Sequence, residues 1–297
     1  MGLKYKIQNS FLVDIFYKND KVRFYFAMCS KNNAVAHIIT KYKHMTNDFL
    51  RRHNIPVFPQ KKFKQAVFKD VINYCKEIKF PVVVKPVGSL CGKGITVDVK
   101  NAAQLKKAVI QAEKIDKNII IEKFYSGWDH RILIAGGKLL AVTKRFPAMV
   151  VGDGHSSVKK LIANKNRKLP KPINIDEEVQ DRLKKEKVTL KSVLPAGRIL
   201  YLRLRANAAL GGTTENLDIS KVHPDNIQIC MKAAKLLHLE LAGLDLMSTD
   251  ISKSYRETGA GITEINDNPA TDIHQTATVN PINNIAEQVL RNLFRIK

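Results

Sequence analysis

Apolar residues alternate with polar ones in several short runs of this chain and recur at helical spacing in others. Alternation predicts half-buried strands, whereas a spacing of three or four residues predicts amphipathic helices. Residues 1–36 alternate on both sides of a turn signal at Lys18–Lys21, which predicts an N-terminal β-hairpin segment. Over residues 36–53 the spacing becomes helical, so Lys43 is expected on a helix.

The same two patterns extend along the rest of the chain. Helices are predicted over residues 64–79, 102–114, 222–239 and 281–297, and strands or hairpins over residues 80–86, 95–99, 118–124, 131–142, 201–214, 243–247 and 261–265. No internal repeat, low-complexity tract or long linker divides these elements. We therefore predict an α+β protein that works as one interdependent unit.

Two of the predicted strands, residues 243–247 and 261–265, carry or adjoin three oxygen donors, Asp245, Glu264 and Asn266. Glu264 and Asn266 share one strand face, and antiparallel pairing would set Asp245 beside them. Carboxylate and amide oxygens suit magnesium held with water and substrate phosphates better than zinc. The pattern therefore indicates an ATP site. The alternative is a solvated Asp245 and a Glu-x-Asn strand end before a turn that contains proline.

A lysine and a glycine-rich loop follow the predicted strand at residues 80–86. Lys85 closes the strand, and the loop Val87–Gly94 contains Lys93. Glycines let backbone N–H groups turn toward an anion, and the lysines add charge, although the loop matches neither the Walker pattern nor the dinucleotide fingerprint. A phosphate-binding loop and a plain turn both remain open.

Acidic residues mark a possible adenine-binding strand edge. Glu122 lies near the end of the strand at residues 118–124, and Asp129 follows shortly after it. At this edge one carboxylate could accept a hydrogen bond from the exocyclic amine of the base, and the other could accept hydrogen bonds from the ribose hydroxyls. A surface strand that happens to carry two acids is the alternative.

Three polar residues, Arg203, Arg205 and Asn207, occupy alternate positions of the predicted strand before the glycine turn Gly211–Gly212. We expect them to be exposed on that strand. Alternating arginines before a glycine turn indicate the capture of an anion.

Composition narrows the class of protein. The chain has 297 residues, and its 50 Lys and Arg against 27 acidic residues give a net charge of +23, which favours anionic partners. Much of this excess is dispersed lysine. The most basic stretch, residues 158–191, lacks the interleaved aromatic residues of a single-strand-binding platform, so a nucleic-acid partner is not expected. Four distant cysteines and no signal peptide or membrane-spanning run predict a cytoplasmic protein without a membrane partner.

Taken in order, these stretches resemble the ATP-grasp superfamily, and within it the ATP-grasp ligase domain of cyanophycin synthetases. Glutathione-synthesising and D-alanine ligases are more distant. The supporting segments are KYKHMTNDFLRRHNIPVF, FPVVVKPVGSLCGKGITV, IIIEKFYSGWDHRILIAGGKLLAV, FPAMVVGDGHSSVKKLI, YLRLRANAALGGTT, HPDNIQICMKAAKLLHLELAGLDLMSTDIS and ITEINDNPA. The resemblance covers residues 37–297.

The resemblance implies two α+β subdomains that grip a nucleotide between them. The lid subdomain is expected at about residues 64–123 and the catalytic subdomain at about residues 124–297, with the glycine loop on the mobile lid. A homo-oligomer is possible by the same analogy.

The resemblance also implies roles for individual residues. ATP-binding roles are implied for Lys43, Lys85, Gly92, Lys93, Gly94, Glu122, Lys123, Phe124 and Asp129, the last of these at the ribose. Asp245, Glu264 and Asn266 match the ligands of magnesium, with two ions expected. Catalytic roles are implied for Arg203, Arg145 and Asn207, and substrate roles for Arg131, Arg205, Gly211 and Gly212. His274 is either a residue of the amine side or a structural residue.

The reaction that the resemblance implies is amide bond formation driven by ATP. A substrate carboxylate attacks the γ-phosphate to give an acyl phosphate, and an amine then displaces phosphate. The substrates are expected to be an amino acid or a peptide, and the charge favours acidic ones. The alternatives are a ligase that modifies a genetically encoded polypeptide and a basic binding module on a disabled scaffold.

This sequence departs from the cyanophycin synthetase pattern near the expected substrate end. Ala270 replaces a glycine, Asp272 replaces an arginine, and Leu204 with Arg205 replaces an Arg-Thr pair. The large N-terminal domain and the C-terminal Mur-ligase-like domain of those enzymes are not found in this sequence. We therefore expect a standalone ligase with a different substrate.

Overall fold

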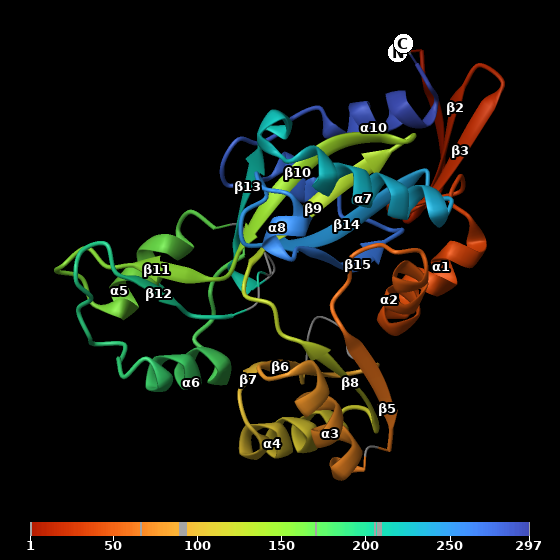
Figure 1. Ribbon diagram of the computed structural model, residues 1–297. Helices are drawn as coiled ribbons and strands as arrows, with labels where there is room; N and C mark the ends of the chain where they lie inside the picture. The colour runs from red at the N-terminus through yellow and green to blue at the C-terminus, as the bar shows by residue number, and fades with distance from the viewer. Residues whose placement is uncertain are drawn as a thin grey trace.

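The computed structural model describes the chain except for residues 1, 66, 89–93, 170, 205, 207–209 and 297. Its centre is a five-stranded antiparallel sheet in the order β13-β10-β9-β14-β15. The strands are β9 (Trp128–Ala135), β10 (Lys138–Phe146), β13 (Thr213–Leu217), β14 (Leu241–Ser248) and β15 (Gly261–Asn266). Helix α7 (Pro224–Leu236) crosses one face of this sheet, and helix α10 (Ile285–Leu293) lies on the other (Figure 1).

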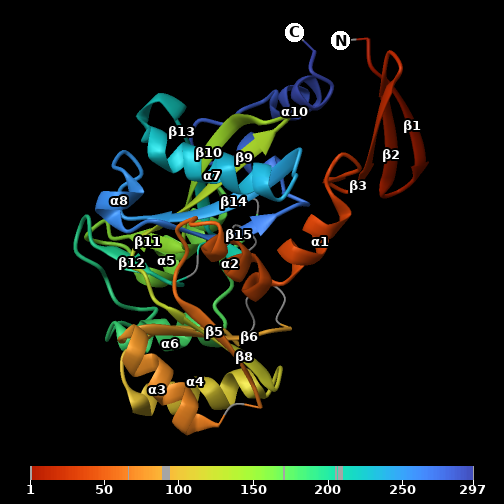
Figure 2. The ribbon, with the colours of Figure 1, turned by 45° about the vertical axis from the view of Figure 1, so that its right-hand side comes forward.

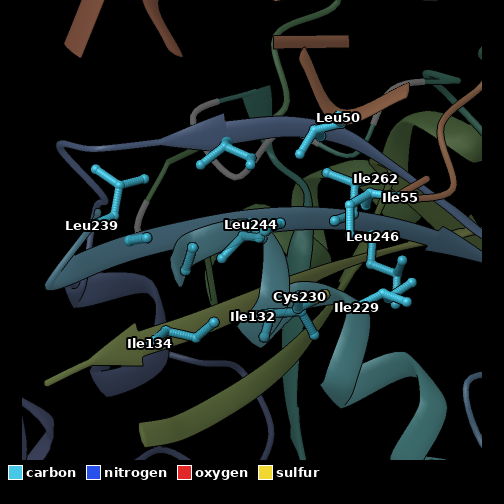
Figure 3. Packing of buried hydrophobic residues seen from close by; sticks show 14 of the residues in the cluster. Leu50, Ile55, Ile132, Ile134, Ile229, Cys230, Leu239, Leu244, Leu246 and Ile262 are labelled. Atoms are coloured by element: carbon cyan, nitrogen blue, oxygen red, sulfur yellow. The ribbon is translucent and has the colours of Figure 1, made fainter. Parts of the chain in front are cut away.

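Strand alternation divides the core between these two helices. Ile132, Leu244 and Leu246 point to the α7 face and pack around Cys230 (Figure 3). Leu133 belongs to a second cluster, with Ala135, Ala141, Leu241 and side chains of α10. Because both faces are covered over this part of the sheet, its strands are held rigidly, which fixes the positions of the polar residues further along them.

A second α+β unit lies below the central sheet (Figure 1). Its sheet has the order β5-β8-β6-β7. The elements are β5 (Gln60–Lys64), α3 (Phe68–Ile78), β6 (Val82–Pro86), β7 (Thr96–Val99), α4 (Ala102–Glu113) and β8 (Asn118–Lys123). The two helices and the sheet enclose their own apolar cluster. β5 was not predicted from the sequence because only Phe63 of its five residues is apolar and buried.

The N-terminal segment folds into a four-stranded sheet. The strands are β1 (Lys4–Asn9), β2 (Leu12–Tyr17), β3 (Asp20–Tyr25) and β4 (Met28–Cys29), paired in chain order. β2 and β3 pair on either side of Lys18–Asn19, where the sequence predicted a turn. The predicted hairpin is therefore present, but it is extended by one strand on each side. The two chain ends lie near each other beside α10 (Figure 2).

The helix predicted over residues 36–53 is interrupted. It forms α1 (Ala34–Lys41) and α2 (Lys43–Arg52), because Tyr42 between them adopts an extended conformation with φ −109° and ψ 101°. Lys43 is thus the first residue of a helix rather than an interior one.

A third group of elements, β11 (Met149–Val151), α5 (Val158–Asn166), α6 (Glu177–Lys185) and β12 (Ile199–Tyr201), extends to one side (Figure 1). It has a small apolar cluster of its own. The strand predicted over residues 201–214 is wrong: β12 ends at Tyr201 and β13 begins at Thr213.

Short helices complete the described chain. They are η2 (Ile219–Lys221), α8 (Tyr255–Thr258) and α9 (Asp272–Gln275). Across the described residues, none of the helices is both long and apolar enough to cross a membrane.

Candidate active site

One row of polar residues crosses the whole central sheet on the face away from α7. Its members are direct cross-strand neighbours, one from each strand: Glu264, Asp245, Arg131, Thr143 and Asn216. Cross-strand partners project to the same side of a sheet, so pairing alone brings these side chains together. We call this set the polar row. It lies beyond the apolar part of the same face that α10 covers.

Asp245 is the anchor of the polar row. Its Oδ1 accepts a hydrogen bond from Arg131 Nε at 2.6 Å, and its Oδ2 lies 2.7 Å from Arg145 Nη2. Arg145 also donates to both oxygens of Asp129, the closer at 2.6 Å. Asp245 is only 5% exposed, so the alternative of a solvated strand residue is wrong.

Burial and charge act against each other at the two carboxylates. Burial raises the pKa of Asp245, but the guanidinium groups of Arg131 and Arg145 outweigh it, and the net pKa is lowered. At Asp129 burial prevails over Arg145, and the nearby Asp245 charge acts in the same direction, so the pKa is raised. Asp245 is thus a firmly ionised carboxylate, as a metal ligand must be.

Glu264 and Asn266 lie beside Asp245 on the same face, as the sequence predicted. Glu264 Oε2 is 2.6 Å from Lys43 Nζ, so the first residue of α2 closes over the end of the polar row. Burial lowers the pKa of Lys43, but the charges of Glu264, Asp245 and Glu122 raise it by more. Lys43 is therefore a cation placed where carboxylates of both sheets meet.

The donors on this face fit magnesium chemically. Asp245, Glu264 and Asn266 offer hard oxygens from two adjacent strands. In the described part of the chain, no three acidic, histidine or cysteine side chains gather into a metal-binding group, and the third donor here is an amide. Such a partial set suits an ion that keeps water and phosphate oxygens in its shell.

Side chains of α1 form hydrogen bonds with the residue that follows Asn266 at the end of β15. Asp267, the next residue, accepts from the Thr40 hydroxyl at 3.2 Å and lies 2.8 Å from His37 Nδ1. Asn32 Nδ2 also donates to the Asp267 carbonyl. These residues were missed because they are far from Asn266 in the sequence and belong to no motif.

The second sheet contributes Lys85 and Glu122. Lys85 Nζ donates to Glu122 Oε1 at 2.7 Å, and both side chains are largely buried. The alternative of a surface strand does not hold for Glu122. Lys123 and Phe124 follow, but the Lys123 ammonium donates to the Lys79 carbonyl, and the Phe124 N–H donates to the Pro81 carbonyl.

Of the glycine loop Val87–Gly94, the structure describes Val87, Gly88 and Gly94. Gly94 has a φ of +69°, a backbone conformation that other residues rarely adopt, and a Cβ there would lie 2.4 Å from Ile115 Cδ1, so glycine is favoured at this position. The predicted residues Gly92 and Lys93 lie outside the described residues.

Arg203 differs from its prediction. It is buried, at 3% exposure, and its guanidinium lies 2.6 Å from both Asp176 and Glu178 at the start of α6. The expectation of an exposed strand arginine is wrong because the chain leaves the strand at Tyr201. Arg205 and Asn207 lie outside the described residues. Gly211 has a φ of +84° and packs against Ile173, with Gly212 buried beside it.

His274 is fully buried against the polar row, and its tautomer follows from the hydrogen bonds. Asn216 Nδ2 donates to the carbonyls of His274 and Asn280 at 2.6 and 2.8 Å, so Asn216 Oδ1 is the acceptor for the Thr143 hydroxyl. That hydroxyl has one proton. Toward His274 Nδ1, 2.5 Å away, the Thr143 oxygen can only accept, and Nδ1 carries the proton.

The other ring nitrogen of His274 is consequently a bare acceptor. Nε2 is buried and has no hydrogen-bond partner among the described residues. Burial and the charges of Arg131 and Arg145 lower the pKa of His274 to about 3, so the ring is neutral at physiological pH. A buried acceptor without a partner costs free energy, and here it lies beside the two arginines that hold Asp245.

Comparison with known proteins identifies this arrangement. Residues 49–195 match the family model described as D-ala D-ala ligase C-terminus, and residues 202–293 match the RimK-like ATP-grasp domain. The chain belongs to the ATP-grasp superfamily. The ATP-grasp fold predicted from the resemblance, of class α+β, is thereby confirmed.

Individual relatives agree with this assignment. The chain is 31% identical over 301 residues to a cyanophycin synthetase of Trichormus variabilis; the match covers 96% of the chain and 32% of that relative. A crystal structure of a bifunctional glutathione synthetase from Pasteurella multocida has a TM-score of 0.70 at 24% identity, covering 99% of this chain and 42% of that one.

A D-alanine–D-alanine ligase from Bacillus anthracis, complexed with ATP, has a TM-score of 0.53 at 14% identity over 89% of this chain and 69% of its own. These two structures show that the ATP-grasp fold is shared. The chain spans 32% of the cyanophycin synthetase that it matches.

Proposed function

We propose that this chain is an ATP-dependent carboxylate–amine ligase, which forms an amide bond through an acyl phosphate. The observation that carries the proposal is the polar row on one face of the central sheet. It sets two carboxylates, an arginine and buried hydrogen-bonding groups across five strands, where a purely structural sheet would carry apolar residues. Burying so many charges is costly, which favours a functional reason for them.

The nucleotide is proposed to bind between the two sheets. Lys43 and Lys85 supply cations for the phosphates, and Glu122 and Asp129 supply acceptors for the base and the ribose. Because the Phe124 N–H is already committed to Pro81, we expect the base to be recognised at this edge largely through carbonyl oxygens. Gly92, Lys93 and Gly94 are proposed to cover the phosphates from the glycine loop.

Asp245, Glu264 and Asn266 are proposed to hold magnesium, with two ions. When bound, magnesium would neutralise charge on the transferring phosphoryl group. Arg131 and Arg145 hold Asp245 in one orientation, so that its oxygens need not reorganise during the reaction. Lys43 and Lys85 add fixed positive charge, and phosphoryl transfer needs such positioning more than a protein nucleophile.

The amine side is proposed to involve His274 and the segment from Arg203 to Gly212, with Arg205 and Asn207 in it. A bare, neutral Nε2 can accept a hydrogen bond from an amine N–H but cannot repel it, as a charged imidazolium would. The net charge of +23 favours an acidic amino acid or peptide as the substrate. Three described cysteines are buried and unpaired, which agrees with a cytoplasmic location.

The test is a substrate panel. ADP and phosphate release would be measured with ATP and magnesium across single amino acids, acidic dipeptides and their pairwise mixtures, with mass spectrometry of the products. The proposal expects release that depends on a carboxylate and an amine, and a product lighter by one water than the sum of the two. Release only with one particular polypeptide would favour the peptide-modifying alternative. Nucleotide binding without release under any mixture would contradict the ligase.

A further inference from the structure

Among the described residues, four carboxylates around the proposed nucleotide site are each paired with a cation before any ligand enters. The carboxylates are Asp129, Asp245, Glu264 and Glu122, and each has a cation at hydrogen-bonding distance; the cations are Arg145, Arg131, Lys43 and Lys85. Within these described pairs, four negative charges meet four positive ones. A divalent cation that enters alone would bring two uncompensated charges into a largely buried cluster, which is unfavourable.

The pairs in this cluster differ in how easily they can be broken. Arg131 and Arg145 reach Asp245 at 2.6 and 2.7 Å, and their side chains are at most 17% exposed. The Lys43 and Glu264 side chains are 43% and 29% exposed. A partly exposed ion pair contributes little free energy, so its members change partners easily. Removing one partner of a buried pair costs much more free energy, because it leaves a buried charge uncompensated. Asp245 is therefore fixed in place, and Glu264 is the carboxylate that can change partners.

Lys43 could also pair with a nucleotide phosphate instead of Glu264. It is the first residue of α2 and experiences the charges of Glu264 and Asp245 from the central sheet and of Glu122 from the second sheet. Its flexible side chain is a point charge that can turn from a carboxylate to a phosphate without a change of backbone.

From these contacts we infer a second role for Lys43: it occupies the cation position on Glu264 until a nucleotide phosphate draws it away, and so makes metal binding depend on nucleotide. The inference rests on the magnesium site of the proposed function, but not on the ligase reaction. Exchange of partners keeps these charges paired, because the phosphates take the lysine and the metal takes the glutamate. Metal and nucleotide then favour each other's binding by the same factor.

The test uses Mn²⁺ as the probe, because its binding can be followed by electron paramagnetic resonance without any turnover. Affinity for Mn²⁺ would be measured on the whole chain with and without ADP. Wild type is expected to bind Mn²⁺ weakly alone and much more tightly with ADP. Lys43→Met frees Glu264 and is expected to bind Mn²⁺ without ADP about fivefold more tightly than wild type, the upper end for one half-exposed ion pair.

Matched variants separate the possible causes. Lys43→Arg retains the cation and is expected to behave like wild type without ADP. The double variant Lys43→Met with Glu264→Gln is expected to lose the gain, because the freed carboxylate is gone. Equal Mn²⁺ affinity of Lys43→Met and wild type in the absence of ADP would overturn the inference.

The same Mn²⁺ titrations also test separately whether Glu264 is a metal ligand. If ADP-dependent Mn²⁺ binding occurs in wild type and disappears in Glu264→Gln, the metal site stands, and Lys43→Met alone decides the inference. If wild type binds no Mn²⁺ even with ADP, the metal site and the inference both fall, whatever the ligase assay shows.

Discussion

Thr143 and Asn216 carry no charge, yet they decide the state of the histidine buried beside them. Asn216 is oriented by two backbone carbonyls, and this fixes the proton of Thr143 and then the tautomer of His274. The sequence offered His274 as either an amine-side or a structural residue. It could not identify the other two, because a threonine and an asparagine on distant strands match no motif.

The lowered pKa of His274 predicts a pH dependence of stability. An unfolded histidine titrates near 6.5, while the folded pKa is about 3. As the pH falls, His274 is therefore protonated in the unfolded chain before it is protonated in the folded one. The contribution of neutral His274 to the free energy of unfolding is fully present above pH 6.5 and is lost as the pH falls toward 3. Between pH 7.5 and 5.5 we expect His274 to account for a loss of about 1.4 kcal/mol in the free energy of unfolding.

Urea unfolding at the two pH values would measure this loss against His274→Asn. The asparagine amide can still donate to Thr143 but does not titrate. The raised pKa of Asp129 acts in the opposite direction, but it is common to both proteins and cancels. An identical pH dependence in the two proteins would show that His274 titrates normally.

Glu264 provides a test of the proposed metal site at the level of one atom. Glu264→Gln preserves the shape of the side chain but removes its charge, so kcat for ATP turnover is expected to fall by about a hundredfold or more, at or above the loss seen for residues that only support a metal ligand. Phosphate release measures the effect, and circular dichroism checks the fold. Full activity would exclude Glu264 as a ligand.

At the scale of elements, the strands were more predictable than their connections. The alternation in residues 243–247 and 261–265 identified β14 and β15, and their pairing sets Asp245 opposite Glu264. The break at Tyr42 was not predicted. The burial of Arg203 was not predictable, because it depends on contacts with a distant segment. Asp176 and Glu178, which bind Arg203, lie in the basic stretch 158–191, for which the sequence indicated no functional site.

The core under α7 keeps the polar row in register, and this can be tested by truncation. Leu244 is fully buried on the face of β14 that packs against α7, so Leu244→Ala is expected to lower the free energy of unfolding by about 2–5 kcal/mol. Ile110, which is 49% exposed on α4, is the control, and Ile110→Ala should change stability by no more than about 0.5 kcal/mol. Chemical unfolding measures both. Equal effects would mean that the packing around Leu244 is looser than described.

At the scale of the whole molecule, the site depends on the second sheet meeting the first. Lys85→Met is expected to weaken nucleotide binding about tenfold or more, through the loss of a charged contact to phosphate. It also leaves Glu122 buried without its partner. The double variant Lys85→Met with Glu122→Gln removes that penalty, so it should recover thermal stability but not nucleotide affinity.

Calorimetric titration with ADP and magnesium would measure these affinities. Recovery of affinity in the double variant would show that Lys85 acts only through Glu122.

At the scale of the whole molecule, the sequence predicted the ATP-grasp fold through a resemblance carried by several ordered segments. Pattern alone predicted only an α+β class, since periodicity does not say which sheets face each other.

The most direct test of the account is to trap the acyl phosphate with hydroxylamine, which requires no knowledge of the natural amine. Wild type would be incubated with ATP, magnesium, hydroxylamine and a panel of amino acid and acidic peptide carboxylates. The account predicts a hydroxamate formed in equal amount to ADP, only with an accepted carboxylate and not in Glu264→Gln. Carboxylate-dependent ADP release without hydroxamate, or ADP release that no carboxylate stimulates, would contradict it.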